Sequence, residues 1–73
     1  MRRKIYQLVR VDTVWDYADK CHFEVERLVL RVRDINDALG MAAEHNKKYG
    51  TTDKYYCVCP EDYRLCIKRK LDS

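Results

Sequence analysis

Four cysteines and two histidines are the side chains of this chain that could bind a metal ion or carry redox chemistry. Cys57 and Cys59 alternate on a segment predicted to be a strand, so both thiols would leave the same face, about 7 Å apart. Cys66 could add a third sulfur, and Cys21 or His22 a fourth ligand. Zinc sites more often use a Cys-x2-Cys pair that wraps a turn around the ion, and the spacing here matches no such pattern. We therefore predict no metal and no cofactor.

Two further interpretations of the cysteines stay open. A disulfide between Cys57 and Cys66 is conceivable across paired strands, but it would be strained, and the cytosol would keep it reduced. Arg64 and Lys68, close to Cys66 in the sequence, could lower a thiol pKa and so support redox sensing. The interpretation that we favour makes these cysteines small, half-buried packing residues of a sheet.

The sequence contains no recognisable catalytic arrangement. Neither His22 nor His45 is near a serine or cysteine in a nucleophile setting, and His45 is expected on the surface of a helix. A calcium loop would need a glycine and a bidentate glutamate that do not follow the aspartates at positions 12, 16 and 19. Two glycines in the whole chain are too few for a phosphate-binding loop. We predict that the protein is not an enzyme.

The length and composition of the chain indicate one small ordered domain. The 73 residues are 47% hydrophobic, which argues against disorder and predicts a single domain over residues 1–73. No uncharged apolar run is long enough to span a membrane. The basic start at residues 1–4 does not lead into a signal peptide, because Gln7, Arg10 and Asp12 interrupt the apolar stretch that one requires. We expect a cytosolic protein.

The net charge is mild. Fifteen Lys and Arg residues against twelve Asp and Glu residues give +3, so attraction to phosphates would have to come from local clusters. Two clusters exist, at residues 2–4 and 68–70. Like charges near chain ends usually stay in water, and we interpret both clusters as solvated ends.

The elements that must position these residues are organised around a helix predicted from Asp34 to Gly50. Asp34 is a suitable N-cap, lysines occupy the last turn, and Gly50 is expected to end the helix in the left-handed conformation. Gly40, in the middle, is expected either on the exposed side or under a close contact. The apolar face comprises Ile35, Ala38, Leu39, Ala42 and Tyr49.

Alternating apolar residues predict four strands around this helix. They cover residues 3–11, 22–33, 55–59 and 64–69, with residues 12–21 as a connecting loop or an irregular hairpin. A bulge near Glu26 or Arg27 would reconcile the two parities within the second strand. The predicted fold is therefore α+β: a four-stranded antiparallel sheet with one helix packed on one face, in the order ββαββ.

A turn centred on residues 61–62 would set the register of the last two strands. Val58 would lie opposite Leu65, Tyr56 opposite Ile67, and Cys57 opposite Cys66. A right-handed crossover would then give the strand order 2-1-3-4. The helix covers only one face, so the other is left for water, a partner or a second copy of the chain. The last two strands would contribute to that uncovered face Tyr55, Cys57, Cys59, Arg64, Cys66 and Lys68.

Two functions fit this arrangement. In the first, which we favour, Trp15 and Tyr17 on the predicted loop contact a protein partner, because aromatic residues dominate binding hot spots. Trp15 could instead fold over an end of the sheet as a lid, and self-association into a homodimer is a variant of the same hypothesis. In the second, the uncovered sheet face binds nucleic acid: Tyr55 stacks on a nucleobase, Arg64 and Lys68 contact phosphates, and the basic termini extend that surface. The nearby acidic residues at positions 24, 26, 61 and 62 would oppose a phosphate backbone.

The order and length of the elements resemble those of very small phage-encoded ββαββ proteins, including some anti-CRISPR inhibitors. The resemblance covers a strand pair, a helix that begins Ile35-Asn36-Asp37-Ala38-Leu39, and a hairpin. It implies a protein that occupies a surface of a host defence complex without cofactor or catalysis. It carries over no binding residue, because no motif is shared. The positive net charge departs from the acidic, DNA-mimicking inhibitors, so an inhibitor of this kind would clamp or occlude its target.

Overall fold

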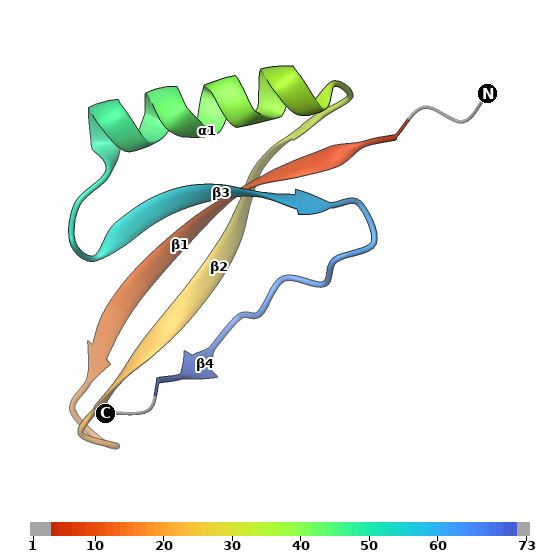
Figure 1. Cartoon of the computed structure of the whole chain (residues 1–73). Helices are drawn as coiled ribbons and strands as arrows, with labels where there is room; N and C mark the ends of the chain where they lie inside the picture. The colour runs from red at the N-terminus through yellow and green to blue at the C-terminus, as the bar shows by residue number, and fades with distance from the viewer. Residues whose placement is uncertain (1–3, 72–73) are drawn as a thin grey trace.

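An antiparallel sheet with one helix along one face forms the protein, as the sequence predicts (Figure 1). The structure is a computed structural model that describes residues 4–71, so Arg2 and Arg3 of the predicted basic cluster lie outside the described residues. In chain order the elements are β1 (Tyr6–Asp16), β2 (Cys21–Val32), α1 (Ile35–Tyr49), β3 (Lys54–Pro60) and β4 (Arg69–Lys70). No helix of the described part is long and apolar enough to cross a membrane.

The hairpin of β1 and β2 is longer than the sequence indicates. Of the two predictions for residues 12–21, the connecting loop is wrong and the hairpin is confirmed, because both strands continue to a short turn at residues 17–20. Asp16 fixes this turn by accepting hydrogen bonds from the backbone N–H groups of Ala18 and Asp19, at 2.8 and 3.2 Å. Lys20 completes it with a positive φ of 53°. The outer half of the hairpin extends away from α1 (Figure 1), so Val14 and Trp15 of β1 are exposed there, whereas Cys21 and Phe23 of β2 are buried.

The predicted bulge in β2 exists, but at a different residue. Leu8 lies opposite Leu30 and Val9 opposite Leu28, so Val29 is the extra residue, rather than Glu26 or Arg27. The bulge changes which side chains of β2 share a face with those of β1. Leu30 faces the helix together with Leu8, whereas Leu28 faces the opposite side together with Val9.

The strand order is β3-β1-β2-β4, which differs from the predicted order 2-1-3-4 in the place of the last strand. The central position of β1 between β2 and β3 is confirmed. The predicted strand at residues 64–69 is wrong: β4 comprises only Arg69 and Lys70, and it pairs with Glu24 and Phe23 of β2. The predicted pairings of Val58, Tyr56 and Cys57 with this strand are therefore wrong, and all three residues lie opposite residues of β1.

Helix α1 begins and ends near the predicted residues, but it ends in a different way. Asp34 caps the helix by accepting a hydrogen bond of 3.1 Å from the backbone N–H of Asp37. Gly50 follows the helix with φ −66° and ψ 140°, so the predicted left-handed conformation is wrong. A glycine is needed there because a Cβ atom would collide with the carbonyl oxygen of Asn46. Gly40 has open space around it and lies on the exposed side.

The helix buries a narrower stripe than the sequence predicts. Ala38 and Ala42 are buried, whereas Ile35, Leu39 and Tyr49 are exposed. Asn46 joins the helix to the sheet with two hydrogen bonds to Tyr56: its Oδ1 accepts from the backbone N–H at 2.6 Å, and its Nδ2 donates to the backbone carbonyl at 2.9 Å. The side chain of Asn46 thus takes the place of a further strand at the outer edge of β3, where the sequence predicts residues 64–69.

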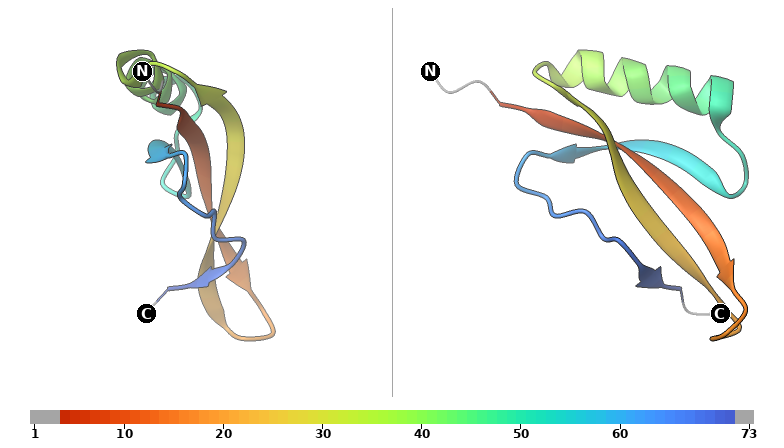
Figure 2. Two further views of the ribbon diagram at one scale, coloured as in Figure 1. Left: turned by 90° about the vertical axis from the view of Figure 1, so that its right-hand side faces the viewer. Right: turned by 180° about the vertical axis from the view of Figure 1, so that it is seen from behind.

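Residues 61–68, named here the crossing segment, pass over the sheet on the face opposite the helix (Figure 2). They run from the end of β3, at one edge, to β4, at the other. Gln7 directs the start of this path, because its Nε2 donates to the carbonyl oxygens of Pro60 and Tyr63 at 2.8 and 2.9 Å. Gln7 is 5% exposed and lies beside the buried residues Leu8 and Val9. The face that the sequence leaves uncovered is therefore partly covered by the chain itself.

Candidate protein-binding surface

Exposed apolar side chains gather at the outer end of the β1–β2 hairpin. We name Val14, Trp15, Tyr17 and Ile67 the hairpin-end surface. Tyr17 and Ile67 are 85% and 80% exposed, and Trp15 is 45% exposed. The four residues line a shallow groove of about 450 Å³ that Phe23 and Lys68 also line. Large apolar side chains so exposed around one groove are typical of a binding surface.

Lys68 joins the end of the crossing segment to the hairpin. Its Nζ lies 2.9 Å from Oδ2 of Asp16 and 4.1 Å from the ring centroid of Phe23. The ammonium thus forms an ion pair and a cation–π contact at once. The hydrogen bond from Lys68, with those from the backbone of Asp19 and Ala18, lowers the pKa of Asp16, and the same bond raises the pKa of Lys68. These contacts hold Ile67 beside the hairpin.

Trp15 is held by its neighbours on the same hairpin. Its ring packs against His22, the residue directly opposite on β2, with a centroid distance of 4.8 Å and an interplanar angle of 67°. Tyr17 meets Trp15 edge to face, with centroids 6.4 Å apart. Aromatic contacts of this geometry fix ring orientation and stabilise a pair by about 0.5–1.5 kcal/mol. The two aromatic rings are therefore pre-oriented while each keeps an exposed face.

The structure brings together three of the five residues that the sequence singles out for binding. Trp15, Tyr17 and Lys68 line the same groove. Tyr55 lies on β3, with its hydroxyl 3.5 Å from Oε2 of Glu24, and Arg64 is exposed on the crossing segment. The predicted placement of Arg64 and Lys68 on one strand beside Tyr55 is wrong, because the chain crosses the sheet at these positions and does not pair with β3.

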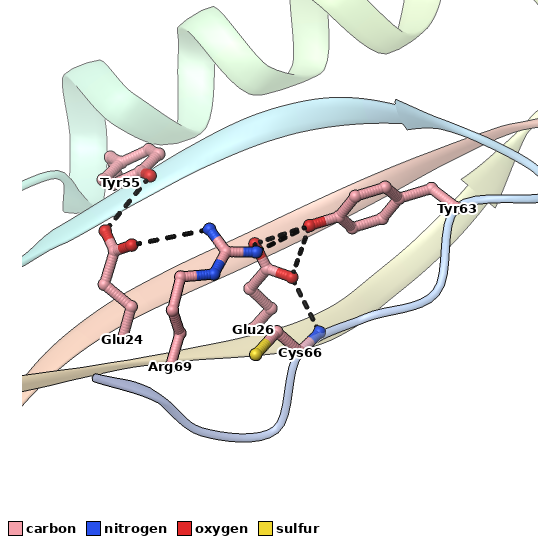
Figure 3. A network of polar contacts seen from close by, with 6 residues as sticks. All are labelled: Glu24, Glu26, Tyr55, Tyr63, Cys66 and Arg69. Atoms are coloured by element: carbon pink, nitrogen blue, oxygen red, sulfur yellow. Dashed lines mark hydrogen bonds and ion pairs between the residues drawn. The ribbon is translucent and has the colours of Figure 1, made fainter. Parts of the chain in front are cut away.

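An ion-pair network joins the C-terminal part of the chain to β2 (Figure 3). The guanidinium of Arg69 lies 3.8 Å from the carboxylate of Glu24 and 3.6 Å from that of Glu26. Glu26 also accepts hydrogen bonds from the hydroxyl of Tyr63 at 2.8 Å and from the backbone N–H of Cys66 at 2.8 Å. The hydrogen bond to Glu26 is the largest cause that raises the pKa of Tyr63. The two carboxylates thus bind the chain's own cation.

This network places carboxylates on the face of the sheet that the nucleic-acid hypothesis requires to be basic. Tyr55, the residue expected to stack on a base, lies next to Glu24, and Glu26 lies on the same face. Burial and the charge of Glu24 raise the pKa of Tyr55. A phosphate backbone near Tyr55 would meet these carboxylates before any free cation.

The cysteines are distributed over three parts of the fold. Cys57 and Cys59 share the face of β3 that lies opposite the helix, Cys66 is on the crossing segment, and Cys21 is buried at the start of β2. All four are free thiols, and residues 4–71 contain no group of three or more potential metal ligands. Burial, together with the neighbouring Cys59, raises the pKa of Cys57 to about 11. Cys57 is therefore a thiol rather than a thiolate near neutral pH.

Sequence reasoning missed Ile67 as a surface residue and Gln7 and Glu26 as organising residues. The sequence instead predicts Ile67 opposite Tyr56 on a fourth strand, whereas the structure leaves it 80% exposed. The sequence does hold a signal for Gln7, since it is the one amide among the alternate positions occupied by Ile5, Val9 and Val11. Glu26 carried none, because a glutamate on a strand is ordinarily a solvated residue.

Together, the fold and this surface define a small α+β protein with an apolar surface at the end of its long hairpin. Comparison with models of protein families, with curated proteins and with solved structures gives no match.

Proposed function

We propose that this is a non-catalytic binding protein that acts by occupying the surface of a protein partner with its hairpin-end surface. The observation that carries the proposal is the exposure of Trp15, Tyr17 and Ile67 around one groove at the protruding end of the hairpin. Tyrosine and tryptophan are enriched among residues that contribute most to protein–protein affinity. Their contacts with each other and with His22 orient them before binding, which reduces the entropy lost on association.

A phage-type inhibitor of a host defence complex is the particular role that we propose, acting in the cytosol. It rests on the resemblance in element order and chain length to very small phage-encoded inhibitors. The net charge of +3 favours an inhibitor that blocks a protein surface over one that imitates DNA. In an alternative form of this hypothesis, the same apolar residues form a homodimer. Sedimentation of the purified protein distinguishes the dimer from the monomer.

The alternative, a nucleic-acid-binding module, has weaker support. It needs Tyr55 and cations on one accessible face, but Lys68 is paired with Asp16, and Tyr55 lies beside Glu24. Of the two cations predicted for that face, Arg64 is exposed and takes part in no ion pair among residues 4–71, and the same holds for Lys4 and Lys70 of the basic termini.

A tagged pull-down from lysate of the native host, with and without nuclease, tests the proposal. We expect one stoichiometric protein that survives nuclease and is lost with the Trp15→Ala/Tyr17→Ala variant. Tyr49→Ala, which removes another exposed aromatic ring, is the matched control and should retain the partner. Enrichment that vanishes with nuclease, or that persists in the double variant, would refute the proposed role of this surface.

A further inference from the structure

The outer edge of β2 is free along half of its length. The pairs that β4 forms with β2 are at Phe23 and Glu24, and the backbone N–H of Glu26 donates to the carbonyl of Cys66 at 2.9 Å. From Glu26 toward Val32 the crossing segment no longer follows the edge of β2 (Figure 1). Residues 27–32 therefore have β1 on one side and, within residues 4–71, no strand on the other.

The other edge of the sheet is protected. At β3, Asn46 binds both the backbone N–H and the carbonyl of Tyr56, and α1 runs along the strand (Figure 1). An incoming strand would have to displace these contacts. The contrast makes residues 27–32 the accessible part of the sheet for further backbone pairing, since unpaired N–H and C=O groups on an edge strand can bind another extended chain.

The side chains along this free edge are either apolar or positively charged. Leu28, Val29 and Leu30 are 41%, 40% and 38% exposed. Arg27, Arg31 and Arg33 are also exposed, and none of them takes part in the ion pairs of the described residues. Residues 27–33 include no acidic residue. The edge thus offers unpaired backbone, apolar contact area and three uncompensated positive charges within one short segment.

The pairing with β1 divides these side chains between the two faces of the sheet. Arg27 and Leu30 lie on the face that carries the helix, opposite Arg10 and Leu8. Leu28 and Arg31 lie on the other face, opposite Val9 and Gln7. A strand added at this edge would therefore find one arginine and one leucine on each face, which suits a segment in which acidic and apolar residues are mixed.

We propose that residues 27–33 bind an extended, acidic segment of a partner protein, which adds to the sheet as a strand beside β2. The occupant is acidic because three arginines without ion pairs flank the pairing positions. It is not a second copy of this chain: antiparallel self-pairing centred on Val29 or Leu30 would set Arg27 opposite Arg31 or Arg33, and like charges directly opposite destabilise a strand pair. This binding site does not depend on the hairpin-end surface.

Titration of the 15N-labelled protein with a blocked seven-residue peptide of alternating glutamate and valine tests the proposal. We expect amide shift changes and slowed hydrogen exchange confined to residues 27–33. The Arg27→Gln/Arg31→Gln/Arg33→Gln variant should bind about tenfold more weakly, as three exposed ion pairs of ordinary strength predict. Lys4→Gln/Lys47→Gln/Lys48→Gln removes the same charge from other exposed positions and should bind as the unaltered protein does.

Two control peptides separate strand addition from simple charge attraction. A peptide of the same sequence with alternate amides N-methylated keeps its charge but cannot form a hydrogen-bonded ladder, and it should not bind. A lysine–valine peptide should not bind either. The Trp15→Ala/Tyr17→Ala variant should retain peptide binding, which keeps this test independent of the proposed function.

Several outcomes would overturn the proposal. Equal binding of the N-methylated peptide would show charge attraction without pairing. Shift changes at these arginines with an oligothymidine, but none with the acidic peptide, would assign the edge to nucleic acid. Absence of peptide binding, combined with self-association of the triple arginine variant, would show that the arginines serve to protect an exposed edge from aggregation.

Discussion

The carboxylate of Glu26 accepts a hydrogen bond of 2.8 Å from the backbone N–H of Cys66, forty residues later in the chain. The backbone N–H of Glu26 in turn donates to the carbonyl of Cys66 at 2.9 Å. This reciprocal pair is where the crossing segment reaches β2. A single residue of β2 thus receives the returning chain through both its backbone and its side chain, and Arg69 and Tyr63 bind to the same carboxylate.

Replacement of this carboxylate should loosen the crossing segment. We expect Glu26→Ala to lower the free energy of unfolding by about 2 kcal/mol, because it leaves the N–H of Cys66 and the hydroxyl of Tyr63 without their charged acceptor. Urea unfolding measures the loss, and hydrogen exchange locates it in residues 61–71. Glu44→Ala, on the exposed side of α1, is the control and should change stability by less than about 0.5 kcal/mol. Equal effects of the two substitutions would contradict the assigned role of Glu26.

Both the donor and the acceptor of the Asn46 side-chain amide should contribute to the stability of the protein. Asn46→Asp keeps an acceptor for the N–H of Tyr56 but loses the donor to its carbonyl, so we expect destabilisation by about 1–3 kcal/mol, with a similar loss in Asn46→Ala. Thermal unfolding followed by circular dichroism measures both. Asn36→Ala, at an exposed position in the first turn of the same helix, is the control. An Asn46→Asp protein as stable as the original would show that the donor bond contributes nothing.

Replacing each of the two glycines by alanine should change the stability of the protein in opposite directions. Gly40→Ala should stabilise the protein by about 0.5–1 kcal/mol, because the position is helical and the space around it is open. Gly50→Ala should destabilise it, because the added Cβ would collide with the carbonyl oxygen of Asn46. Paired urea titrations measure both effects, and a change of the same sign in both variants would disprove the geometric explanation.

Alkylation should reveal the raised pKa of Cys57. With a pKa of about 11 against an ordinary 9.0, its thiolate fraction at pH 8 is about a hundredfold lower than that of an unperturbed thiol, and the rate falls accordingly. Raising the pH favours the thiolate, so the rate should rise about tenfold per unit until the pH approaches 11. Iodoacetamide labelling read by peptide mass spectrometry measures this rate, with free cysteine in the same tube as reference. Labelling of Cys57 as fast as the reference at pH 8 would rule out the shift.

The aromatic residues of the hairpin-end surface should contribute to binding more than to folding. Trp15→Ala/Tyr17→Ala removes side chains that are 45% and 85% exposed, so we expect a loss of about 1 kcal/mol in stability and cooperative unfolding. Affinity for the captured partner should fall at least about thirtyfold if both rings are hot spots. Calorimetry measures the affinity, and far-UV circular dichroism the fold. A variant that unfolds would show instead that these rings belong to the core.

The sequence was sufficient to predict the elements whose causes are local. The cap at Asp34, the lysines of the last turn and the alternation of apolar residues in β1 and β3 depend on near neighbours. α1 and β3 form within a residue of the predicted bounds, whereas β1 continues to Asp16, beyond its predicted end at residue 11. The central place of β1 followed from the crossover rule. The sequence singles out Trp15 and Tyr17 by their position outside any apolar period, and the structure places both beside one groove; their role in binding stays a prediction.

The rest depends on contacts between distant residues. The fourth strand was placed beside β3 because a short turn after Pro60 normally returns the chain to its neighbour. In the structure Asn46 already occupies that edge, and Gln7 directs the chain over the opposite face. The sequence does not indicate the partner of either side chain, since each is a single polar residue that binds backbone groups far away; Gln7 stands out only as an amide among apolar residues. Ile67 and Lys68 therefore reach the hairpin, a position that local patterns could not indicate.

The outer half of the hairpin lies beyond the helix, whereas the largest fully buried side chains, Leu8, Val9 and Val11, are all in the inner half of β1. The residues that maintain the fold and those that are free to contact another molecule are therefore different sets. Selection on one set can proceed with little penalty in the other, because exposed substitutions remote from the core rarely change stability by much. Substitutions at the outer end of the hairpin can therefore change its surface chemistry while the architecture is kept.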